Sequence, residues 1–331
     1  MNTSSSTEQP PEEQTDVPRV TYLYLRWLMV LLPAMLLVVT VCTALLQGKL
    51  ESSISAYYGG PVRDVFVGVM FGTAACMVAY RGYSLLEDYT LNGAGFYAVF
   101  VALVPFNLDK ILIALRENTT PDGVTPADYV WFLRTALTTV LALFVSLLWI
   151  ELKNSNRLRG LWRSGWWNRF FVAVTTVLLL SFLLLAMVRL WGPDPDDVTM
   201  HGISLGSWSV SIHLLAAILL IAALAIAVWC HAYPALVAAA EGGGDIPSTV
   251  PSIQRGYKVI FLLMAAGPVA AALVRIVTRE HTVIFLEWWE ILLFCLFWIL
   301  ETQRIRKVQS GAGAAQTLAS TGTSSAQQIS M

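Results

Sequence analysis

The sequence predicts an all-α fold, a polytopic bundle of eight transmembrane helices. Three observations lead to this prediction. Hydrophobic residues fill 56% of the 331 positions and charged residues only 13%, whereas soluble domains carry about 25% charged residues. Eight apolar runs approach or exceed the ~20 residues that an α-helix needs to cross a bilayer. The basic residues gather in loops that would face one side of the membrane.

The composition also excludes several classes of protein. A chain with a mean hydropathy of +0.63 is neither a soluble enzyme nor a disordered scaffold. Its net charge of −1 leaves no basic surface for nucleic acid. The four cysteines lie inside apolar runs without C-x-x-C spacing, so we expect free buried thiols rather than a disulfide framework or a zinc site. No motif indicates a cofactor.

The predicted membrane domain covers residues 23–303, between N- and C-terminal tails at 1–22 and 304–331 that we expect to be disordered. Its spans are 23–46, 62–80, 89–108, 128–150, 170–191, 208–230, 258–277 and 282–303. The third run is the weakest, because Asn92, Gly93, Gly95 and Pro105 interrupt it. In a seven-span alternative, residues 89–108 would lie flat on the membrane or re-enter it.

The distribution of basic residues favours eight spans. The 151–169 loop carries five basic residues against one acid, which predicts that it is cytoplasmic. Eight spans then put both termini in the cytoplasm and the acidic 192–207 loop outside. Seven spans would instead put Arg19, Arg26 and Arg81 outside, against the positive-inside rule.

Titratable residues inside the spans are the best guide to function, because such groups are costly in a membrane and face a cavity or a partner. The topology puts seven of them in the outer half of the bilayer: Arg63, Asp64, Arg134, His213, Arg275, Glu287 and Glu290. The inner halves of the helices read as almost wholly apolar. Arg63, Asp64 and Arg275 are close enough to the surface to snorkel, so a structural role is favoured for them. For the four deeper residues a shared polar site is the favoured interpretation.

One segment carries a family resemblance. Residues 53–68, SISAYYGGPVRDVFVG, resemble the S-I-S-x-Y-Y…R-D-x-F-V-G signature of uncharacterised bacterial multi-pass integral membrane proteins. The helix that bears His213, the triplet 255–257 and the segment 285–298 are more loosely similar to later parts of that family, and there is a weaker likeness to DRAM-like membrane proteins. The resemblance implies a membrane fold without a defined reaction. It nominates Ser53, Ser55, Tyr57, Tyr58, Arg63, Asp64, His213 and Glu290 as site residues.

Three functions remain open at this point. The first is a binding or sensing protein of the bacterial inner membrane without catalytic residues, whose polar outer layer takes a small molecule or a lipid headgroup among the surrounding membrane lipids. The alternative is a lipid-modifying, hydrolase-like enzyme that uses Asp64, His213 and Glu290. A small-solute transporter is third. No metal site is predicted, because the four histidines lack helical ligand spacing, and the oligomeric state stays open.

Overall fold

The chain forms an α-helical membrane bundle with one small β-hairpin. The computed structural model describes residues 12–57, 61–106, 108–117, 123–154, 160, 165–192, 201–205, 208–241, 251–277 and 281–328. Within these residues, eight helices are long and apolar enough to cross a membrane, which confirms the predicted all-α fold with eight spans. They are Val20–Gln47, Val62–Ala79, Leu85–Glu117, Pro126–Lys153, Trp166–Trp191, Ile212–Ala232, Pro251–Val274 and Thr282–Lys307.

The helices of the first half are α1 (Glu12–Gln47), α2 (Pro61–Ala79), α3 (Leu85–Leu103), α4 (Leu108–Glu117) and α5 (Pro126–Asn154), with the 3-10 turn η1 (Ile54–Tyr57) between α1 and α2. Those of the second half are α7 (Trp166–Trp191), α8 (Ile212–Ala232), α9 (Pro234–Ala240), α10 (Pro251–Val277) and α11 (Thr282–Gln328). Strands β1 (His201–Leu205) and β2 (Trp208–Ser211) pair antiparallel before α8. Because β2 takes the first four residues of the predicted span 208–230, α8 begins at Ile212. Ser211 caps the helix by accepting a hydrogen bond from the Leu214 amide at 3.2 Å.

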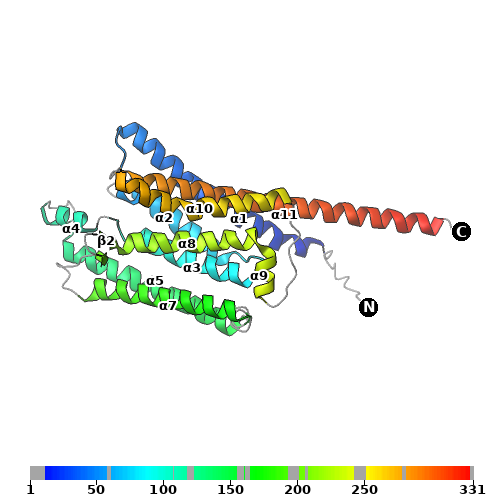
Figure 1. Cartoon of the computed structure of the whole chain (residues 1–331), viewed down its shortest axis with the longest axis horizontal. Coiled ribbons are helices and arrows are strands. Elements are labelled where there is room, and N and C mark those ends of the chain that lie inside the picture. The colour runs from blue at the N-terminus through cyan, green and yellow to red at the C-terminus, as the bar shows by residue number, and fades with distance from the viewer. Residues whose placement is uncertain are drawn as a thin grey trace, which may run out of the picture.

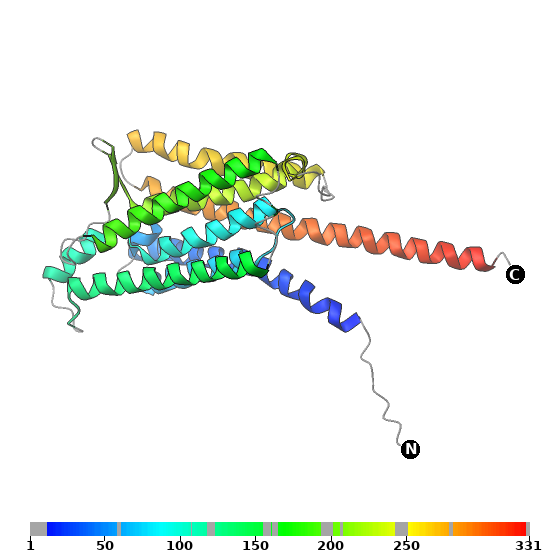
Figure 2. The same cartoon turned by 90° about the horizontal axis from the view of Figure 1, so that it is seen from below.

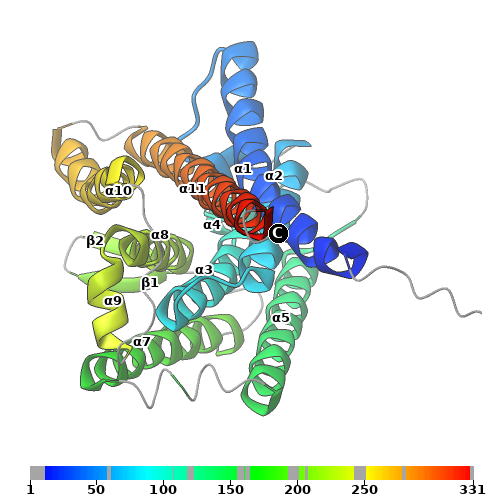
Figure 3. The ribbon, with the colours of Figure 1, turned by 90° about the vertical axis from the view of Figure 1, so that its right-hand side faces the viewer.

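Six helices form the centre of the bundle. The helices α1, α2, α3, α8, α10 and α11 pack in a closed ring, in which each contacts the next and α11 returns to α1. Figure 3 looks along this ring from the end at which α11 projects. Helices α5 and α7 lie beside it with few buried residues, and large apolar side chains such as Leu148 and Leu184 are exposed. Such side chains suit contact with lipid tails.

The weakest predicted span is the most buried helix of the bundle. More than half of the α3 side chains in its span are enclosed by neighbouring helices. One of the interrupting glycines has a packing reason: a Cβ on Gly95 would lie 3.0 Å from the Ala74 carbonyl oxygen of α2, and small residues allow helices to approach this closely in membranes. The helix ends at Leu103, before Pro105, since the residue that precedes a proline avoids helical geometry.

The two ends of the bundle differ. Both described termini lie at one end, which we call the terminal end, and the β-hairpin, η1 and α4 lie at the other, the hairpin end (Figure 1). The start of α7 also belongs to the terminal end, because the Gly165 amide donates to the Ala240 carbonyl of α9 at 3.2 Å. The start of α7, which follows the predicted basic loop, and both described termini are therefore on the same side.

The terminal segments differ from the prediction of disordered tails. Helix α1 already begins at Glu12, and α11 continues to Gln328, far beyond the bundle in Figure 2. Extending an existing helix adds one hydrogen bond per residue without a new nucleation step.

Candidate functional site

The turn η1 is fastened to α11 by one carboxylate at the hairpin end. The Ser53 hydroxyl donates to Glu287 Oε1 at 2.6 Å, and the Ile54 amide donates to Glu287 Oε2 at 2.6 Å. Ser53 is fully buried and Ile54 nearly so. The sequence prediction put these residues in one outer layer, and the structure joins them directly.

His213 continues this polar group from α8. Its Nδ1 lies 2.6 Å from the Val104 carbonyl oxygen at the end of α3, and its Nε2 lies 3.2 Å from Ser55 Oγ. Ser55 Oγ in turn lies 3.0 Å from Ser53 Oγ. A carbonyl oxygen only accepts, so the Nδ1 atom of His213 carries a proton. Ser53, Ser55, His213 and Glu287 thus form one hydrogen-bonded chain, which we call the serine chain.

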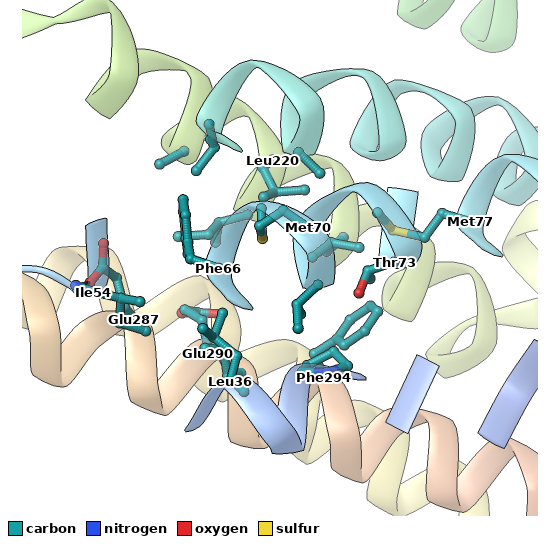
Figure 4. A pocket seen from close by; sticks show the side chains of 18 residues that line it. Leu36, Ile54, Phe66, Met70, Thr73, Met77, Leu220, Glu287, Glu290 and Phe294 are labelled. Carbon is teal, nitrogen blue, oxygen red and sulfur yellow. Dashed lines mark hydrogen bonds between the residues drawn. The ribbon is translucent and has the colours of Figure 1, made fainter. Parts of the chain in front are cut away.

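A cavity of about 130 Å³ lies inside the helix ring next to Glu287. Its walls come from α1, η1, α2, α3, α8 and α11 and are apolar apart from Thr73, Glu287 and Glu290. Figure 4 shows Glu290 and Thr73 among apolar side chains such as Phe66 and Phe294. An engineered apolar cavity of about 150 Å³ holds a benzene molecule, so this one suits a ligand body of similar size.

Glu290 is the unusual group of the cavity. Its side chain is only 7% exposed, and neither carboxylate oxygen has a hydrogen-bond partner among the residues that the structure describes. The same holds for the Thr73 hydroxyl across the cavity. On α10, Gly267 leaves room for the carboxylate, because a Cβ there would lie 2.6 Å from Glu290 Oε1.

The deeper arginine does not join this group. Arg134 of α5 is 4% exposed and donates from Nε to the Leu190 carbonyl of α7 at 2.8 Å. Its guanidinium lies 4.9 Å from the ring centroid of Trp131 and 5.3 Å from that of Trp191. The predicted grouping of Arg134 with His213 and the glutamates is therefore wrong. Arg134 instead satisfies a carbonyl near the end of α7 and stacks between two indoles.

The remaining predicted site residues have other surroundings. Arg63 and Asp64 are exposed near the start of α2, in keeping with the expected position at the membrane surface. Tyr57 is buried, and its hydroxyl lies 3.3 Å from the Lys49 carbonyl oxygen, to which it donates. Tyr58 lies outside the described residues, as does the side chain of Arg275.

A second buried polar group lies at the terminal end, where the predicted topology has the almost wholly apolar inner halves of the helices. At the terminal end, His231 Nε2 lies 2.9 Å from Glu87 Oε1, and Nδ1 lies 3.4 Å from Glu301 Oε2. Glu301 also accepts from the Tyr257 hydroxyl at 2.8 Å and from Arg304 through Nε at 2.9 Å and through a terminal nitrogen at 2.7 Å. We call these five residues the inner cluster. All but Tyr257 are charged or titrate near neutral pH, and each of the five is less than a tenth exposed.

The loop between α2 and α3 closes over the inner cluster. The Tyr83 amide donates to Glu87 Oε2 at 3.1 Å, and its hydroxyl donates to the Cys230 carbonyl. Burial, helped by the charges of Glu301 and Glu87, raises the pKa of Tyr80 well above its ordinary value. Burial likewise raises the pKa of Tyr83. Both hydroxyls therefore stay protonated at any physiological pH.

A signal for the inner cluster was present in the sequence. Glu290 and Glu301 are 11 residues apart, so at 3.6 residues per turn they lie within about 20° of one another around α11. Arg304 follows Glu301 by three positions on the same face. Reading α11 as one long acidic stripe, rather than ending the polar layer at Glu290, would have pointed to a second buried group.

The described residues hold no group of three or more His, Cys, Asp or Glu side chains arranged to bind a metal. No protein-family model, curated protein or solved structure matches this chain. The resemblance of residues 53–68 to a bacterial membrane-protein family stays a prediction, and the proposal that follows depends on the site itself.

Proposed function

We propose that this protein binds a small amphipathic amine in the outer half of the membrane, with the amine on Glu290 and an apolar body in the cavity. One observation carries the proposal: a buried carboxyl without a hydrogen-bond partner in the described structure stands in a cavity whose other walls are apolar apart from Thr73 and Glu287. Burying an unpaired carboxylate costs several kcal/mol. A bound cation, or a donor group of a ligand, removes this cost.

The shape and polarity of the cavity narrow the ligand class. Apolar side chains from α1, α2, α3, α8 and α11 favour a hydrocarbon body about the size of a benzene ring. Two acidic side chains on α11, Glu287 and Glu290, disfavour an anionic ligand. The Thr73 hydroxyl, which lacks a partner in the described residues, offers a second hydrogen bond to a ligand with a donor or acceptor.

The membrane setting is part of the same proposal. We propose the bacterial inner membrane, with both termini in the cytoplasm, since the start of α7, which follows the basic loop of the sequence, and both described termini belong to the terminal end. The end of the cavity that Ile54 and Glu287 line then lies on the outer leaflet side of the bundle. Membrane lipids surround the exposed apolar side chains of α5 and α7.

Thermal unfolding of the full-length protein in lipid nanodiscs tests the proposal with three probes of similar size: benzylamine, benzyl alcohol and toluene. A ligand at 100 times its Kd stabilises the folded state by about 2.7 kcal/mol. We expect saturable stabilisation that is largest for benzylamine. In Glu290→Gln we expect the stabilisation by benzylamine to fall to that by benzyl alcohol, because the substitution removes the carboxylate and keeps the shape of the side chain.

A cavity-filling variant, Ala217→Leu, is the matched control for partitioning into lipid. Ala217 lines the cavity, so a leucine there should abolish saturable binding of all three probes. The proposal is wrong if benzylamine binds wild type no better than toluene does, or if its preference survives Glu290→Gln.

A second candidate, the lipid-modifying hydrolase, has one contact in its favour. Ser55 Oγ lies 3.2 Å from His213 Nε2, within reach for a nucleophile and its base. Asp64, which that hypothesis uses together with His213 and Glu290, is exposed on α2, whereas Ser55 and His213 are both 2% exposed. Turnover of a fluorescent lipid ester that is lost in Ser55→Ala would favour the enzyme, and inertness of wild type would exclude this reaction.

A further inference from the structure

The serine chain consists of groups that can each pass on a proton. Its links are Glu287 Oε1 to Ser53 Oγ at 2.6 Å, Ser53 Oγ to Ser55 Oγ at 3.0 Å, and Ser55 Oγ to His213 Nε2 at 3.2 Å. Its two ends are fixed from outside. The Ile54 amide occupies Glu287 Oε2, and the Val104 carbonyl holds the Nδ1 proton of His213. A further proton on either end can therefore serve a link of the chain only from the atom that faces it, Oε1 of Glu287 or Nε2 of His213.

Counting protons along the chain gives a definite result. Each of the three links needs one proton, and the two serine hydroxyls supply only two. If His213 were neutral and Glu287 ionised, one link would set two lone pairs against each other in a buried site. If His213 were charged and Glu287 protonated, one link would hold two protons. Only an arrangement with one additional proton, on His213 or on Glu287, satisfies all three links.

We infer that His213 and Glu287 share a single proton and that the serine chain relays it between them. In one state, Glu287 is a carboxylic acid that donates to Ser53, Ser53 donates to Ser55, and Ser55 donates to a neutral His213. In the transfer, the Glu287 proton moves to Ser53, the Ser53 proton moves to Ser55, and the Ser55 proton moves to His213 Nε2. The products are a Glu287 carboxylate and a His213 imidazolium, with every O–H and N–H bond that breaks replaced by one that forms.

The relay changes the charge on the cavity wall without any proton leaving the protein. Glu287 lines the cavity, whereas His213 does not. A negative charge on Glu290, one helical turn further along α11, favours the state with the proton on Glu287. The other charges close to η1 in the sequence, Lys49 and Glu51, are paired with each other at 2.6 Å, and Arg63 and Asp64 on α2 are exposed. The relay itself needs no ligand, so it does not depend on the proposed function.

Nitrogen-15 NMR of the full-length protein with labelled histidine, in lipid nanodiscs without added ligand, tests the relay. The chain has only four histidines, so His213→Gln assigns the His213 signals by their loss. The infrared band of the Glu287 carboxylic acid is assigned in the same way by Glu287→Gln. We expect His213 to keep its Nδ1 proton throughout, and the protonated fractions of His213 Nε2 and Glu287 to add up to one.

Substitutions within the chain sharpen the test. Glu287→Gln should make His213 wholly neutral, because a glutamine amide donates to Ser53 and the serines then point toward His213. Ser53→Ala should uncouple the two groups, and Ser53→Thr, which keeps the hydroxyl, should restore the sharing. Ser52→Ala is the matched control, since Ser52 is the exposed neighbour.

Two results would overturn the inference. One is a wild-type protein in which His213 is neutral and Glu287 ionised at the same pH. The other is a Ser53→Ala protein whose protonation states equal those of wild type. If Ser53→Ala does not fold, the protonated fractions of His213 Nε2 and Glu287 in the wild-type protein decide whether the inference holds. Loss of amine binding with the shared proton intact would reject the proposed function and leave the relay standing.

Discussion

Ser53 Oγ lies 2.6 Å from Glu287 Oε1, although the two residues are 234 positions apart in the chain. This hydrogen bond joins the segment between the first two spans to the last span. Together with the bond from the Ile54 amide, it fixes η1 over the hairpin end of the cavity. The side chain of Glu287 therefore both anchors η1 and lines the cavity.

Removing that anchor should destabilise the protein. In Glu287→Ala the buried Ile54 amide loses its acceptor, which costs about 1–3 kcal/mol. The free energy of unfolding in mixed detergent micelles measures the effect. Glu117→Ala, at an exposed position of α4, is the control and should change stability by less than about 0.5 kcal/mol. Equal effects of the two substitutions would show that Glu287 does not anchor η1.

Gly267 should tolerate no side chain while Glu290 keeps its position. A Cβ on Gly267 would lie 2.6 Å from Glu290 Oε1, so Gly267→Ala should cost about 1–3 kcal/mol through overpacking. Gly93→Ala is the matched control in α3, because a Cβ on Gly93 would meet no other atom within 4 Å. It should be neutral or stabilise by about 0.5–1 kcal/mol. Adding Glu290→Ala to Gly267→Ala should restore most of the lost stability, and a failure to do so would place the clash elsewhere.

Removing one partner from the inner cluster should destabilise the protein strongly. Glu301→Gln leaves Arg304 without its carboxylate and His231 with Glu87 alone, and breaking a buried ion pair in this way costs about 3–5 kcal/mol. Tyr257→Phe removes one hydrogen bond to the same carboxylate and should cost about 0.5–1.5 kcal/mol. Lys307→Ala, exposed on the same helix, is the control. Unfolding of the purified variants in micelles checks all three, and a Glu301→Gln protein as stable as Lys307→Ala would contradict the prediction.

Arg134 should not be replaceable by lysine. A lysine keeps the charge but loses both the guanidinium contacts with the rings of Trp131 and Trp191 and the Nε donor to Leu190. We expect Arg134→Lys to lower stability by about 1–2 kcal/mol and to loosen α5 from α7. Arg189→Lys, at an exposed position of α7, should have little effect. Limited proteolysis and thermal unfolding compare the two, and equal susceptibility would remove Arg134 from the α5–α7 contact.

The orientation of the chain has a direct test. A fluorescent protein fused to the C-terminus should be bright if that end is cytoplasmic. Alkaline phosphatase fused after Gly123, in the exposed connection at the hairpin end, should be active if that end faces outward. The reverse pattern would invert the topology and move the cavity to the inner leaflet side.

Much of the fold follows from hydropathy alone. Apart from the third span, the predicted spans begin and end within a few residues of the helices in the structure. The start of α10 is an exception, because this helix already begins at Pro251. The third span looked doubtful because Asn92, Gly93, Gly95 and Pro105 interrupt it. Gly95 shows what such a residue can contribute: the helix is enclosed by protein, and its close packing against Ala74 of α2 requires a glycine.

The candidate site was predictable only in part. Depth in the membrane selected His213, Glu287 and Glu290 from the sequence, and the resemblance added Ser53 and Ser55. Depth could not show that Arg134 lies apart from His213 and the two glutamates. Side-chain fit, rather than distance from the membrane surface, decides which helices pack together.

The sequence by itself determined the membrane class, the number of spans and a set of titratable residues that had to be shielded from lipid, because each of these follows from the cost of putting polar groups in hydrocarbon. Only the tertiary structure decided which of them meet. The ring of six helices brings η1, α8 and α11 together, so that two serines link His213 to Glu287, while Glu290 faces the cavity and a second cluster forms around His231. The low overall charge of the chain therefore hides two buried polar groups, because packing gathers charges that are far apart in the sequence.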